Sequence, residues 1–518
     1  MVVLLCSIPL GAQTPGIGQN GVFNAASHIA PTLAGGALAP GALVTIQGVR
    51  LGSSRSTTSV SFHKGAVSIP METLSVHNAQ VDALLPMSAP IGSASLVVTV
   101  NGEASLPFPV EVVPSNPGIF SRNGLGWGAG RIENADASQN SGSNPTRPGQ
   151  RARIRVTGLG KATQAELMVG NQAVRGEIAR STAQPGEYEI AFPIPGNVAQ
   201  GCNVPVYLRL GPSRASNVVT MAIRSGIGPC DPGPIPTLTL NQKVGIVILS
   251  RTRIKSRSAD PDPIYDEAMG AFVALNEDSK PSPLMLLPPA GTCTAYTSSF
   301  QSVTMTPNSF SSAFIAELGG AGLDAGRNLA LSRNSPPDMM PRNPNAPGFY
   351  TRLGNSDRHS GPRTARVLLP FLDPGEYRLE GAGGKDVGPF SVRIPGPVPF
   401  EWTDRDRTST IVRDRGFTVH WRGVAADRLI VILATNVDQI STAIGTCLCT
   451  AKADAGQFTI PAAMLANLPA SKDIPGIPYD RVLVASLPVK TAPSLQATGL
   501  NGGEVFSVFA DSRIVQFR

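Results

Sequence analysis

The density of glycine and proline restricts the fold of this chain more than any other feature. Gly occurs 54 times and Pro 47 times in 518 residues. In helix interiors these residues cost about 1 and about 3 kcal/mol relative to Ala, and only 15% of the residues are charged, so helix bundles are excluded. The apolar fraction of 42% is enough for cores, and the length exceeds what one core supports. The sequence therefore predicts an all-β chain of several domains.

An internal repeat divides the first part of the chain into two similar halves. Residues 40–52 and 148–160 both open with Pro-Gly, continue as an alternating strand and end in Leu-Gly. Further on, Leu84-Leu85-Pro86 aligns with Ala191-Phe192-Pro193. Alternating runs between such turns are typical of sandwich strands. The repeat therefore predicts two β-sandwiches of similar size.

Four segments of this region resemble, in the same order, the landmarks of a known tandem domain. They are residues 21–27, 39–41, 116–120 and 157–160, which read Gly-Val-Phe-Asn-Ala-Ala-Ser, Ala-Pro-Gly, Asn-Pro-Gly-Ile-Phe and Thr-Gly-Leu-Gly. The domain is an IPT/TIG-like, immunoglobulin-like domain of unknown function found in secreted proteins of acidobacterial type. The resemblance covers about residues 17–225 and departs from the pattern at Val49-Arg50 and in the polar stretch 133–144. It implies an immunoglobulin-like fold and export, and it implies no catalytic residues.

The predicted organisation has six parts. Residues 1–12 form a signal-like segment, 17–113 and 114–225 two immunoglobulin-like domains, 226–243 a Pro-rich linker, 244–395 a loop-rich β domain, and 396–518 a sandwich-like β domain. In the last part Phe417, Val419 and Trp421 alternate with polar residues, which predicts that Trp421 lies in a core. We therefore expect tandem immunoglobulin-like β-sandwiches followed by loop-rich C-terminal β domains.

The N-terminus reads as the end of a secretory signal. Residues 2–10 are mostly apolar and lead into Leu10-Gly11-Ala12, with small residues where cleavage occurs. The basic residues that open a signal are missing, so either the true start lies upstream or the run is only an apolar tail. No later stretch reaches the roughly 18 consecutive apolar residues of a membrane-spanning helix. We expect an exported protein, secreted or at the cell surface, without a transmembrane segment.

Export makes disulfides an expected feature. When Cys6 leaves with the signal, the remaining cysteines are Cys202, Cys230, Cys293, Cys447 and Cys449. Cys202 and Cys230 flank one strand pair and its exit, so we predict that they are joined. Cys293 is predicted to join Cys447 or Cys449, which leaves one thiol without a partner. A zinc site is disfavoured because Cys447-Leu448-Cys449 is one residue tighter than the usual pair and no histidine is near.

The net charge of +7 is spread along the chain rather than gathered on one element. In two places the cations alternate with other residues: Arg151, Arg153 and Arg155, and then Arg251, Arg253, Lys255 and Arg257. Such period-two charge is typical of the solvent face of a half-buried strand, and an anionic-ligand strip is the alternative. Neither strip has interleaved aromatic residues for base stacking, so nucleic acid is not expected as a partner.

The chain carries no motif of a catalytic or cofactor site, and its five histidines are isolated. A hydrolase with its site in residues 250–370 is one alternative, and its carboxylates would come from Glu317, Asp324, Asp338 and Asp357, which no spacing pairs. A weak calcium site is another alternative, and its carboxylates would come from Asp260, Asp262, Asp266 and Glu267 in a Pro-broken loop.

These observations favour an exported, non-enzymatic protein that acts as an extracellular or surface interaction, adhesion or spacer module. Its expected partner is a protein or a polysaccharide, with no cofactor. The alternative is a carbohydrate-binding or enzyme-accessory protein, because Trp127 and Trp402 are predicted to offer exposed rings for sugar stacking. An array of this kind is expected to be elongated rather than compact.

Overall fold

The computed structural model describes residues 14–180, 184–211, 214–234, 241–255, 262–275, 286–299, 320–333, 336–355, 369–438, 443–472, 480–489 and 494–518. Nearly all regular structure in these residues is β-strand, so the predicted all-β fold class is confirmed. Several predicted features lie outside them: the signal-like segment 1–12 with Cys6, residues 235–240 of the linker, Arg257, and the carboxylates of Asp260, Glu317 and Asp357.

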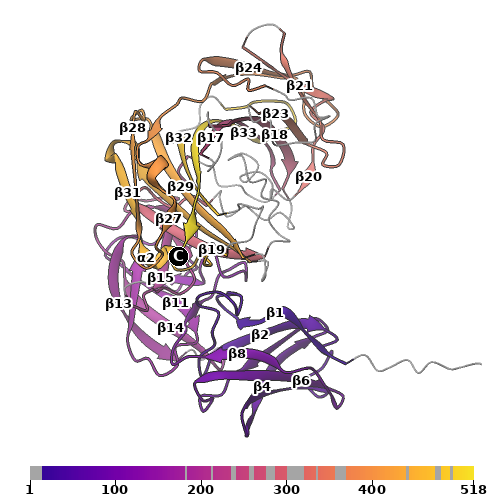
Figure 1. Cartoon of the computed structure of the whole chain (residues 1–518), viewed down its shortest axis with the longest axis vertical. Coiled ribbons are helices and arrows are strands. Elements are labelled where there is room, and N and C mark those ends of the chain that lie inside the picture. The colour runs from indigo at the N-terminus through magenta and orange to yellow at the C-terminus, as the bar shows by residue number, and fades with distance from the viewer. Residues whose placement is uncertain are drawn as a thin grey trace, which may run out of the picture.

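Residues 16–112 form an immunoglobulin-like β-sandwich, here called the first sandwich (Figure 1). Its strands are β1 (Gly16–Asn24), β2 (Leu43–Val49), β3 (Thr58–Lys64), β4 (Val67–His77), β5 (Gln80–Leu84), β6 (Gly92–Val100), β7 (Glu103–Ala104) and β8 (Phe108–Val112). One layer contains β1, β2, β5 and the end of β4, and the other contains the start of β4 with β3, β6 and β8. Apolar side chains from both layers, among them Ile46, Phe62 and Leu96, meet in one core.

Residues 118–223 form the second sandwich on the same strand path. Its strands are β9 (Gly118–Ile119), β10 (Ile132–Asn134), β11 (Arg151–Thr157), β12 (Ala165–Val169), β13 (Gln172–Arg180), β14 (Glu187–Pro193), β15 (Gly201–Leu208) and β16 (Val219–Ile223). β13 passes between the layers as β4 does, because its first half pairs with β12 and its second half with β14. The core contains Ile154, Phe192 and Val206.

The backbone hydrogen bonds correct one detail of the repeat. The N–H of Gly41 donates to Leu85 O at 2.9 Å, and the N–H of Gly149 donates to Ile194 O at 2.9 Å. Leu85 therefore corresponds to Ile194 and not, as predicted, to Phe192. A shift of two residues keeps every side chain on the same face, so the apolar pattern could not reveal the error.

The two sandwiches meet at a joint centred on the buried Asn116, which lies between β8 and β9. Its Nδ2 donates to the carbonyls of Gly35 and Ala37 at 2.6 Å each. The backbone N–H of Asn116 donates to Gly158 O at 3.0 Å, and its carbonyl accepts from Asn24 Nδ2 at 3.2 Å. One residue thus ties a loop of the first sandwich to the end of a strand of the second.

All four segments that carry the family resemblance lie at this joint. The first and third supply the two asparagines just described. The segment 157–160 begins with Thr157, whose Oγ1 accepts from the N–H of Leu43 at 2.9 Å and donates to Gly186 O at 2.6 Å. The segment 39–41 leads directly into Leu43. The four segments therefore encode a contact between the two sandwiches as well as parts of the sandwiches themselves.

In the described residues of the C-terminal half, nine strands form one curved sheet, here called the long sheet (Figure 1). The strands are β17 (Lys243–Lys255), β18 (Ile264–Ala274), β19 (Thr292–Ser299), β20 (Ala321–Gly322), β23 (Phe349–Asn355), β29 (Arg428–Asp438), β30 (Ala443–Lys452), β32 (Arg481–Pro488) and β33 (Gly502–Ile514). At its centre β17 and β33 pair in parallel, from Val244 opposite Gly502 to Lys255 opposite Arg513.

The domain boundary predicted between residues 395 and 396 is wrong. β17 and β18 precede that point, β33 follows it, and all three lie side by side in the long sheet. β19 likewise pairs with β30 across the boundary. The alternation of residues within a strand indicates which face is buried but not which strand pairs with it, so the sequence did not reveal this pairing.

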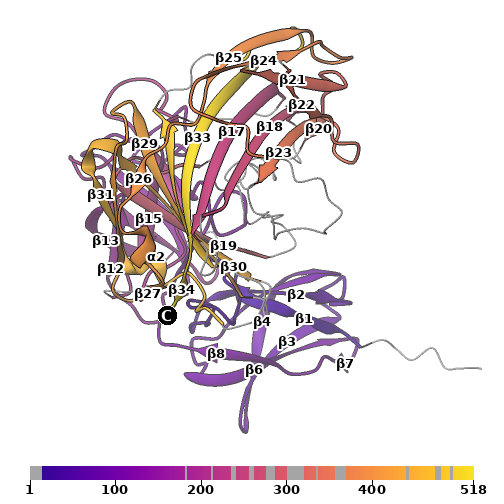
Figure 2. The same ribbon diagram turned by 45° about the horizontal axis from the view of Figure 1, so that its top comes forward.

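The outer face of the long sheet is covered by two smaller sheets (Figure 2). The cover sheet contains β21 (Asn328–Ser332), β22 (Asp338–Pro341), β24 (Glu376–Gly381) and β25 (Phe390–Pro395). The side sheet contains β26 (Glu401–Trp402), β28 (Phe417–Arg422) and β31 (Gln457–Ile460); next to it lie η3 (Arg405–Arg407), η4 (Ala453–Ala455), α2 (Ala462–Leu465) and the pair β27 (Thr410–Ile411) and β34 (Gln516–Phe517). Trp421 of the side sheet is buried in the core, as predicted.

A belt of ion pairs separates the two cores of the outer face. Arg251 binds Asp266 at 2.7 Å, and Arg253 binds Asp511 at 2.7 Å. Arg405 also reaches Asp511, at 3.2 Å. The carboxylates of Asp266 and Asp511 are fully buried. The interpretation of Arg251 and Arg253 as the solvent face of a strand is therefore wrong, and because both guanidiniums are occupied they form no open anionic-ligand strip.

The second sandwich packs directly on the C-terminal half. Tyr207 and Val218 belong to the same core as Trp421 and Ile432, and Met168 packs against it. This shared core places the second sandwich beside β19 and α2 (Figure 1). The units are therefore joined by buried surfaces rather than by a linker alone.

Substituting Gly158 by Ala tests the joint, with Gly149→Ala as the matched control. Both glycines have positive φ angles, +78° and +84°, so both variants carry backbone strain of about 1–2 kcal/mol. A Cβ on Gly158 would lie 2.6 Å from Asn116 O, whereas one on Gly149 meets no atom within 4 Å. We expect Gly158→Ala to lower the unfolding temperature further and to enlarge the radius of gyration in small-angle X-ray scattering. Equal effects of the two variants would contradict the tight contact.

Candidate ligand cleft between the second sandwich and the long sheet

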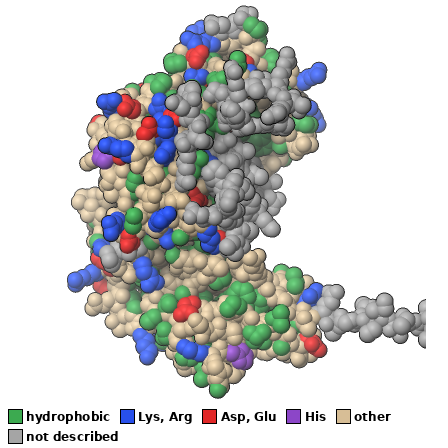
Figure 3. Space-filling view, viewed as in Figure 1, with side chains coloured by type: hydrophobic (Ala, Val, Ile, Leu, Met, Phe, Trp, Pro, Cys, Tyr) green, Lys and Arg blue, Asp and Glu red, His purple; other side chains and the backbone are tan. Residues whose placement is uncertain are grey.

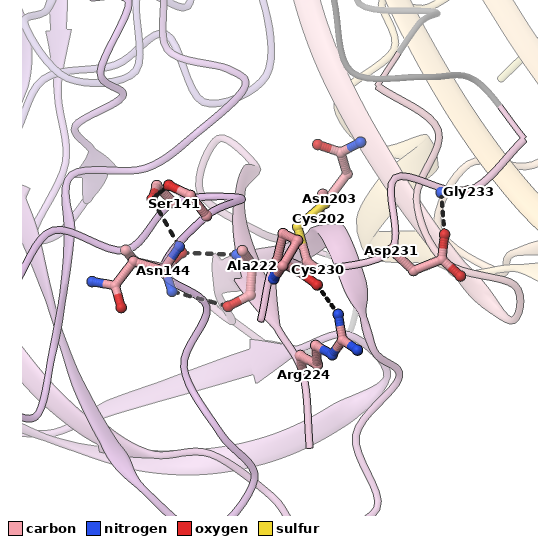
Figure 4. The surroundings of a disulfide bond; sticks show 12 residues. Ser141, Asn144, Cys202, Asn203, Ala222, Arg224, Cys230, Asp231 and Gly233 are labelled. Carbon is pink, nitrogen blue, oxygen red and sulfur yellow. Dashed lines mark hydrogen bonds between the residues drawn. A yellow bond between two sulfur atoms is a disulfide. The ribbon is translucent and has the colours of Figure 1, made fainter. Parts of the chain in front are cut away.

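The structure joins Cys202 to Cys230, as predicted. Cys202 begins β15, and Cys230 lies in the segment that leaves β16 (Figure 4). Two backbone hydrogen bonds hold the same crossing, from Cys202 N–H to Asp231 O at 3.0 Å and from Cys230 N–H to Gly142 O at 2.8 Å. The bond therefore fastens the exit of the second sandwich to its own sheet, just before the chain enters β17.

The second disulfide joins Cys293 of β19 to Cys449 of β30. The sequence left Cys447 and Cys449 open as partners, and the cross-strand register decides between them, because Cys293 lies directly opposite Cys449. The remaining thiol, Cys447, is fully buried, and burial raises its pKa well above the usual range. The three sulfur atoms lie within 4.8 Å of one another, but two of them are already joined. Cys293 also lines the cleft described below.

The two tryptophans predicted as exposed sugar platforms are not exposed. Trp402 is only 3% exposed, and its indole Nε1 donates to Asp404 Oδ1 at 2.6 Å. Trp127 is half-buried, with its ring centroid 6.1 Å from that of Tyr296 on β19. It lies where both sandwiches meet the long sheet, beside Ile29 of the first sandwich. Both rings therefore hold the structure together, and the alternation of apolar residues gave no sign of the neighbours that cover them.

Four of the carboxylates named in the hydrolase and calcium hypotheses form ion pairs in the described residues. Asp324 binds Arg342 at 2.9 Å, and Asp338 binds Arg352 at 3.0 Å. Asp262 contacts Lys255 at 3.2 Å and Arg405 at a shorter distance, while Asp266 belongs to the ion-pair belt. Glu267 points to the opposite face of β18 from Asp266. These residues are therefore not gathered into a site.

A cleft of about 260 Å³ lies between the second sandwich and the C-terminal half. The residues of the second sandwich that line it are Met168, Gly170, Asn171, Tyr207 and Arg209. The residues of the C-terminal half that line it are Gly291, Thr292, Cys293, Phe458, Pro461, Ala463 and Met464. Apolar walls with a few polar groups are typical of small-ligand sites.

Three polar groups give the cleft its chemistry. Burial raises the pKa of Tyr207 to about 12, so its phenol keeps its proton at neutral pH. Arg209 is half exposed, with a 3.4 Å hydrogen bond from Nε to Gly211 O and a 3.8 Å contact to Glu166. Asn171 is exposed in the turn after β12. The cleft therefore combines an aromatic wall with guanidinium and amide hydrogen-bonding groups.

Sequence reasoning missed this cleft, because its two walls come from distant parts of the chain. One signal was present in the sequence of β15. Residues 204–208 are apolar at every position, whereas a strand with one solvated face alternates. Tyr207 lies on this second apolar face, where it packs against the C-terminal half and is only 6% exposed.

The surface shows no large basic patch on the face drawn in Figure 3, where Lys and Arg are scattered among Asp and Glu. None of the helices in the described residues is long and apolar enough to span a bilayer. The two disulfides of the described residues are typical of proteins from oxidising compartments.

No protein-family model matches the sequence, and no curated protein matches it. Among solved structures, the chain is similar to a tetra-tandem repeat in the extending region of a large adhesion protein, with 10% identity over 96% of this chain and 98% of that chain and a TM-score of 0.14. It is also similar to SGBP-B from the mixed-linkage glucan utilization locus of Bacteroides ovatus, with 11% identity over 78% of each chain and a TM-score of 0.14. The Escherichia coli adhesin FdeC shares 10% identity over 73% of this chain and 96% of that chain, with a TM-score of 0.15. Likenesses this weak carry no argument about this chain.

Two cysteine variants test the assigned pairing. Cys449→Ala opens the bond that spans 156 residues, which is expected to cost about 2–5 kcal/mol of unfolding free energy. Cys447→Ala removes a nearby buried thiol without opening any bond and is expected to cost about 1 kcal/mol. Urea unfolding of the oxidised proteins measures both. A larger loss for Cys447→Ala than for Cys449→Ala would show that Cys447 is the bonded residue.

Proposed function

We propose that this chain is an exported, non-enzymatic interaction protein that binds its partner at the cleft between the second sandwich and the long sheet. The observation that carries the proposal is the construction of the cleft. Its walls come from two units that share one buried core, so its shape is fixed before a ligand arrives. Preformed sites avoid part of the entropy cost of binding.

The chemistry of the cleft favours the end of a glycan as its ligand. Phe458 is partly exposed in the cleft and offers aromatic surface, on which the apolar faces of sugar rings stack. Arg209 and Asn171 offer hydrogen-bond donors at the rim, as hydroxyl-rich ligands require. The volume of about 260 Å³ lies just below the lower limit of roughly 300 Å³ for drug-sized ligands, so the cleft fits a chain end rather than a polymer segment.

Export is supported by the disulfides, since such bonds persist in oxidising compartments. The resemblance of residues 17–225 to a secreted immunoglobulin-like tandem domain points in the same direction. A rigid interaction protein is favoured over a flexible spacer, because Asn116 and the shared core around Tyr207 hold the units together.

The double variant Arg209→Ala/Asn171→Ala tests the proposed function. Both side chains are on the rim, so the fold is expected to survive, while the dissociation constant for a captured glycan rises about tenfold or more as two hydrogen bonds are lost. A glycan array identifies the ligand, and isothermal titration measures its affinity. Arg153→Ala, an exposed arginine on β11 that does not line the cleft, is the matched control. Unchanged affinity in the double variant, or turnover of the bound glycan, would overturn the proposal.

A further inference from the structure

The inner face of the long sheet, opposite the cover and side sheets, changes character along its strands. Its middle is apolar, and the side chains there include Ile248, Leu433, Leu483, Phe506 and Val508. Side chains alternate between faces, so the residues two and four positions further along each strand belong to the same face. At one end of the sheet six inner-face residues are polar: Ser250, Thr252, Thr435, Thr446, Arg481 and Ser512. We call these six residues the polar end. The apolar Ile254 and Ala510 lie among them, and Glu267 lies opposite Ser250 on the same face.

The register places three of these side chains in one row. Arg481 lies directly opposite Thr435, and Thr435 lies directly opposite Thr446. Ser512 on the neighbouring strand lies opposite Leu483, two residues from Arg481 on the same face. Side chains opposite one another in this way lie about 5 Å apart at Cβ. The residues of the polar end are therefore neighbours on one face of the sheet.

Several hydroxyls of the polar end are buried without a partner. Thr252, Thr435 and Ser512 are each 1% exposed, and none of their hydroxyl oxygens has a hydrogen-bond partner. A buried hydroxyl without a partner costs about 1–3 kcal/mol. Such groups also occur elsewhere in the described residues, for example at Ser507 on the outer face. Three on one face beside a cation are consistent with a site for a polar ligand.

In the part of the chain that the structure describes, Arg481 lacks the bonded carboxylate that Arg251 and Arg253 have on the outer face. Among the described residues, no ion pair or hydrogen bond involves its guanidinium, whereas Arg251 and Arg253 on the outer face each bind a buried carboxylate. The carboxylate of the adjacent Asp480 accepts from the Ser471 hydroxyl and from Val437 N–H and forms no hydrogen bond with Arg481. Burial lowers the pKa of Arg481 to about 10, while the charges of Asp480 and Tyr265 act in the opposite direction.

We propose that the polar end of the inner face binds a carboxylate ligand. The guanidinium of Arg481 donates two parallel hydrogen bonds to the carboxylate, the geometry for which arginine is suited. The hydroxyls of Thr435 and Ser512 donate to the lone pairs that remain on the carboxylate. The ligand is an acidic sugar or a small organic acid, which share this group. This site is independent of the cleft and of the function proposed for it.

Thermal unfolding of the full chain with sodium galacturonate, sodium acetate, galactose and sodium sulfate tests the site. Carboxylate binding is expected to raise the unfolding temperature by more than about 2 °C at saturating ligand, because the ligand stabilises only the folded state. A response to galacturonate alone identifies an acidic sugar, and an equal response to acetate identifies a small acid. Galactose has the ring without the charge and is expected to leave the temperature unchanged. A response to sulfate alone, or to none of the four, overturns the proposal.

Arg481→Met separates a binding role from a structural one. If Arg481 binds a ligand, the variant loses the carboxylate response. Without ligand it unfolds at the same or a higher temperature, because a buried cation without a bonded anion has been removed. A variant that unfolds earlier and still responds to carboxylate would overturn the assignment. Arg481→Lys keeps the charge but loses the paired geometry, and is expected to weaken binding about tenfold or more.

Two further variants act as controls. Arg393→Met removes an arginine whose side chain is 75% exposed on the cover sheet, and it should keep the full response. Arg209→Ala in the cleft should also keep it. A loss of the response in the cleft variant would mean that carboxylates bind there and not at Arg481, and the two proposals are thereby tested separately.

Discussion

The C-terminal half depends on the parallel pairing of β17 with β33. Parallel neighbours cannot be joined by a tight turn, so the chain between them must leave the sheet and return. Every other described strand of this half except β34 belongs to that long crossover, including both smaller sheets. The pairing is reinforced on the outer face, where Arg253 of β17 binds Asp511 of β33, and Asp511 in turn accepts from Arg405 beside the side sheet. The ion-pair belt thus connects the central strands to the layer that covers them.

The sequence predicted local structure well and long-range structure poorly. The Pro-Gly turns at Gly41 and Gly149 marked equivalent strand entries, and the alternation around Trp421 identified a buried face, because both signals lie within a few residues. Spacing could not decide between Cys447 and Cys449, since both point to the same face of β30 and only the register of β19 separates them. The cleft at Tyr207 and the row at Arg481 depend on strands far apart in the chain, and no local pattern contains that information.

Rigidity is a common property of both proposed binding surfaces. The cleft depends on the core that Tyr207 shares with the C-terminal half, and that sandwich is fixed in turn to the first one through Asn116. The polar end depends on the long sheet, whose edge strand β19 is fastened to β30 by the disulfide at Cys293. The disulfide that forms part of the cleft wall therefore also supports the sheet behind it, so a ligand at either surface meets a framework already in place.

The position of β33 in the middle of the long sheet bears on how the protein is made. The two sandwiches are built from consecutive segments, so each can fold while the rest of the chain is still being synthesised. The long sheet cannot close in this way, because β17 and β32 both await a strand that begins at Gly502. Until that strand arrives, two long apolar edges remain open to pairing with other chains. If the chain is exported before the long sheet closes, the open edges of different copies do not meet in the crowded interior of the cell.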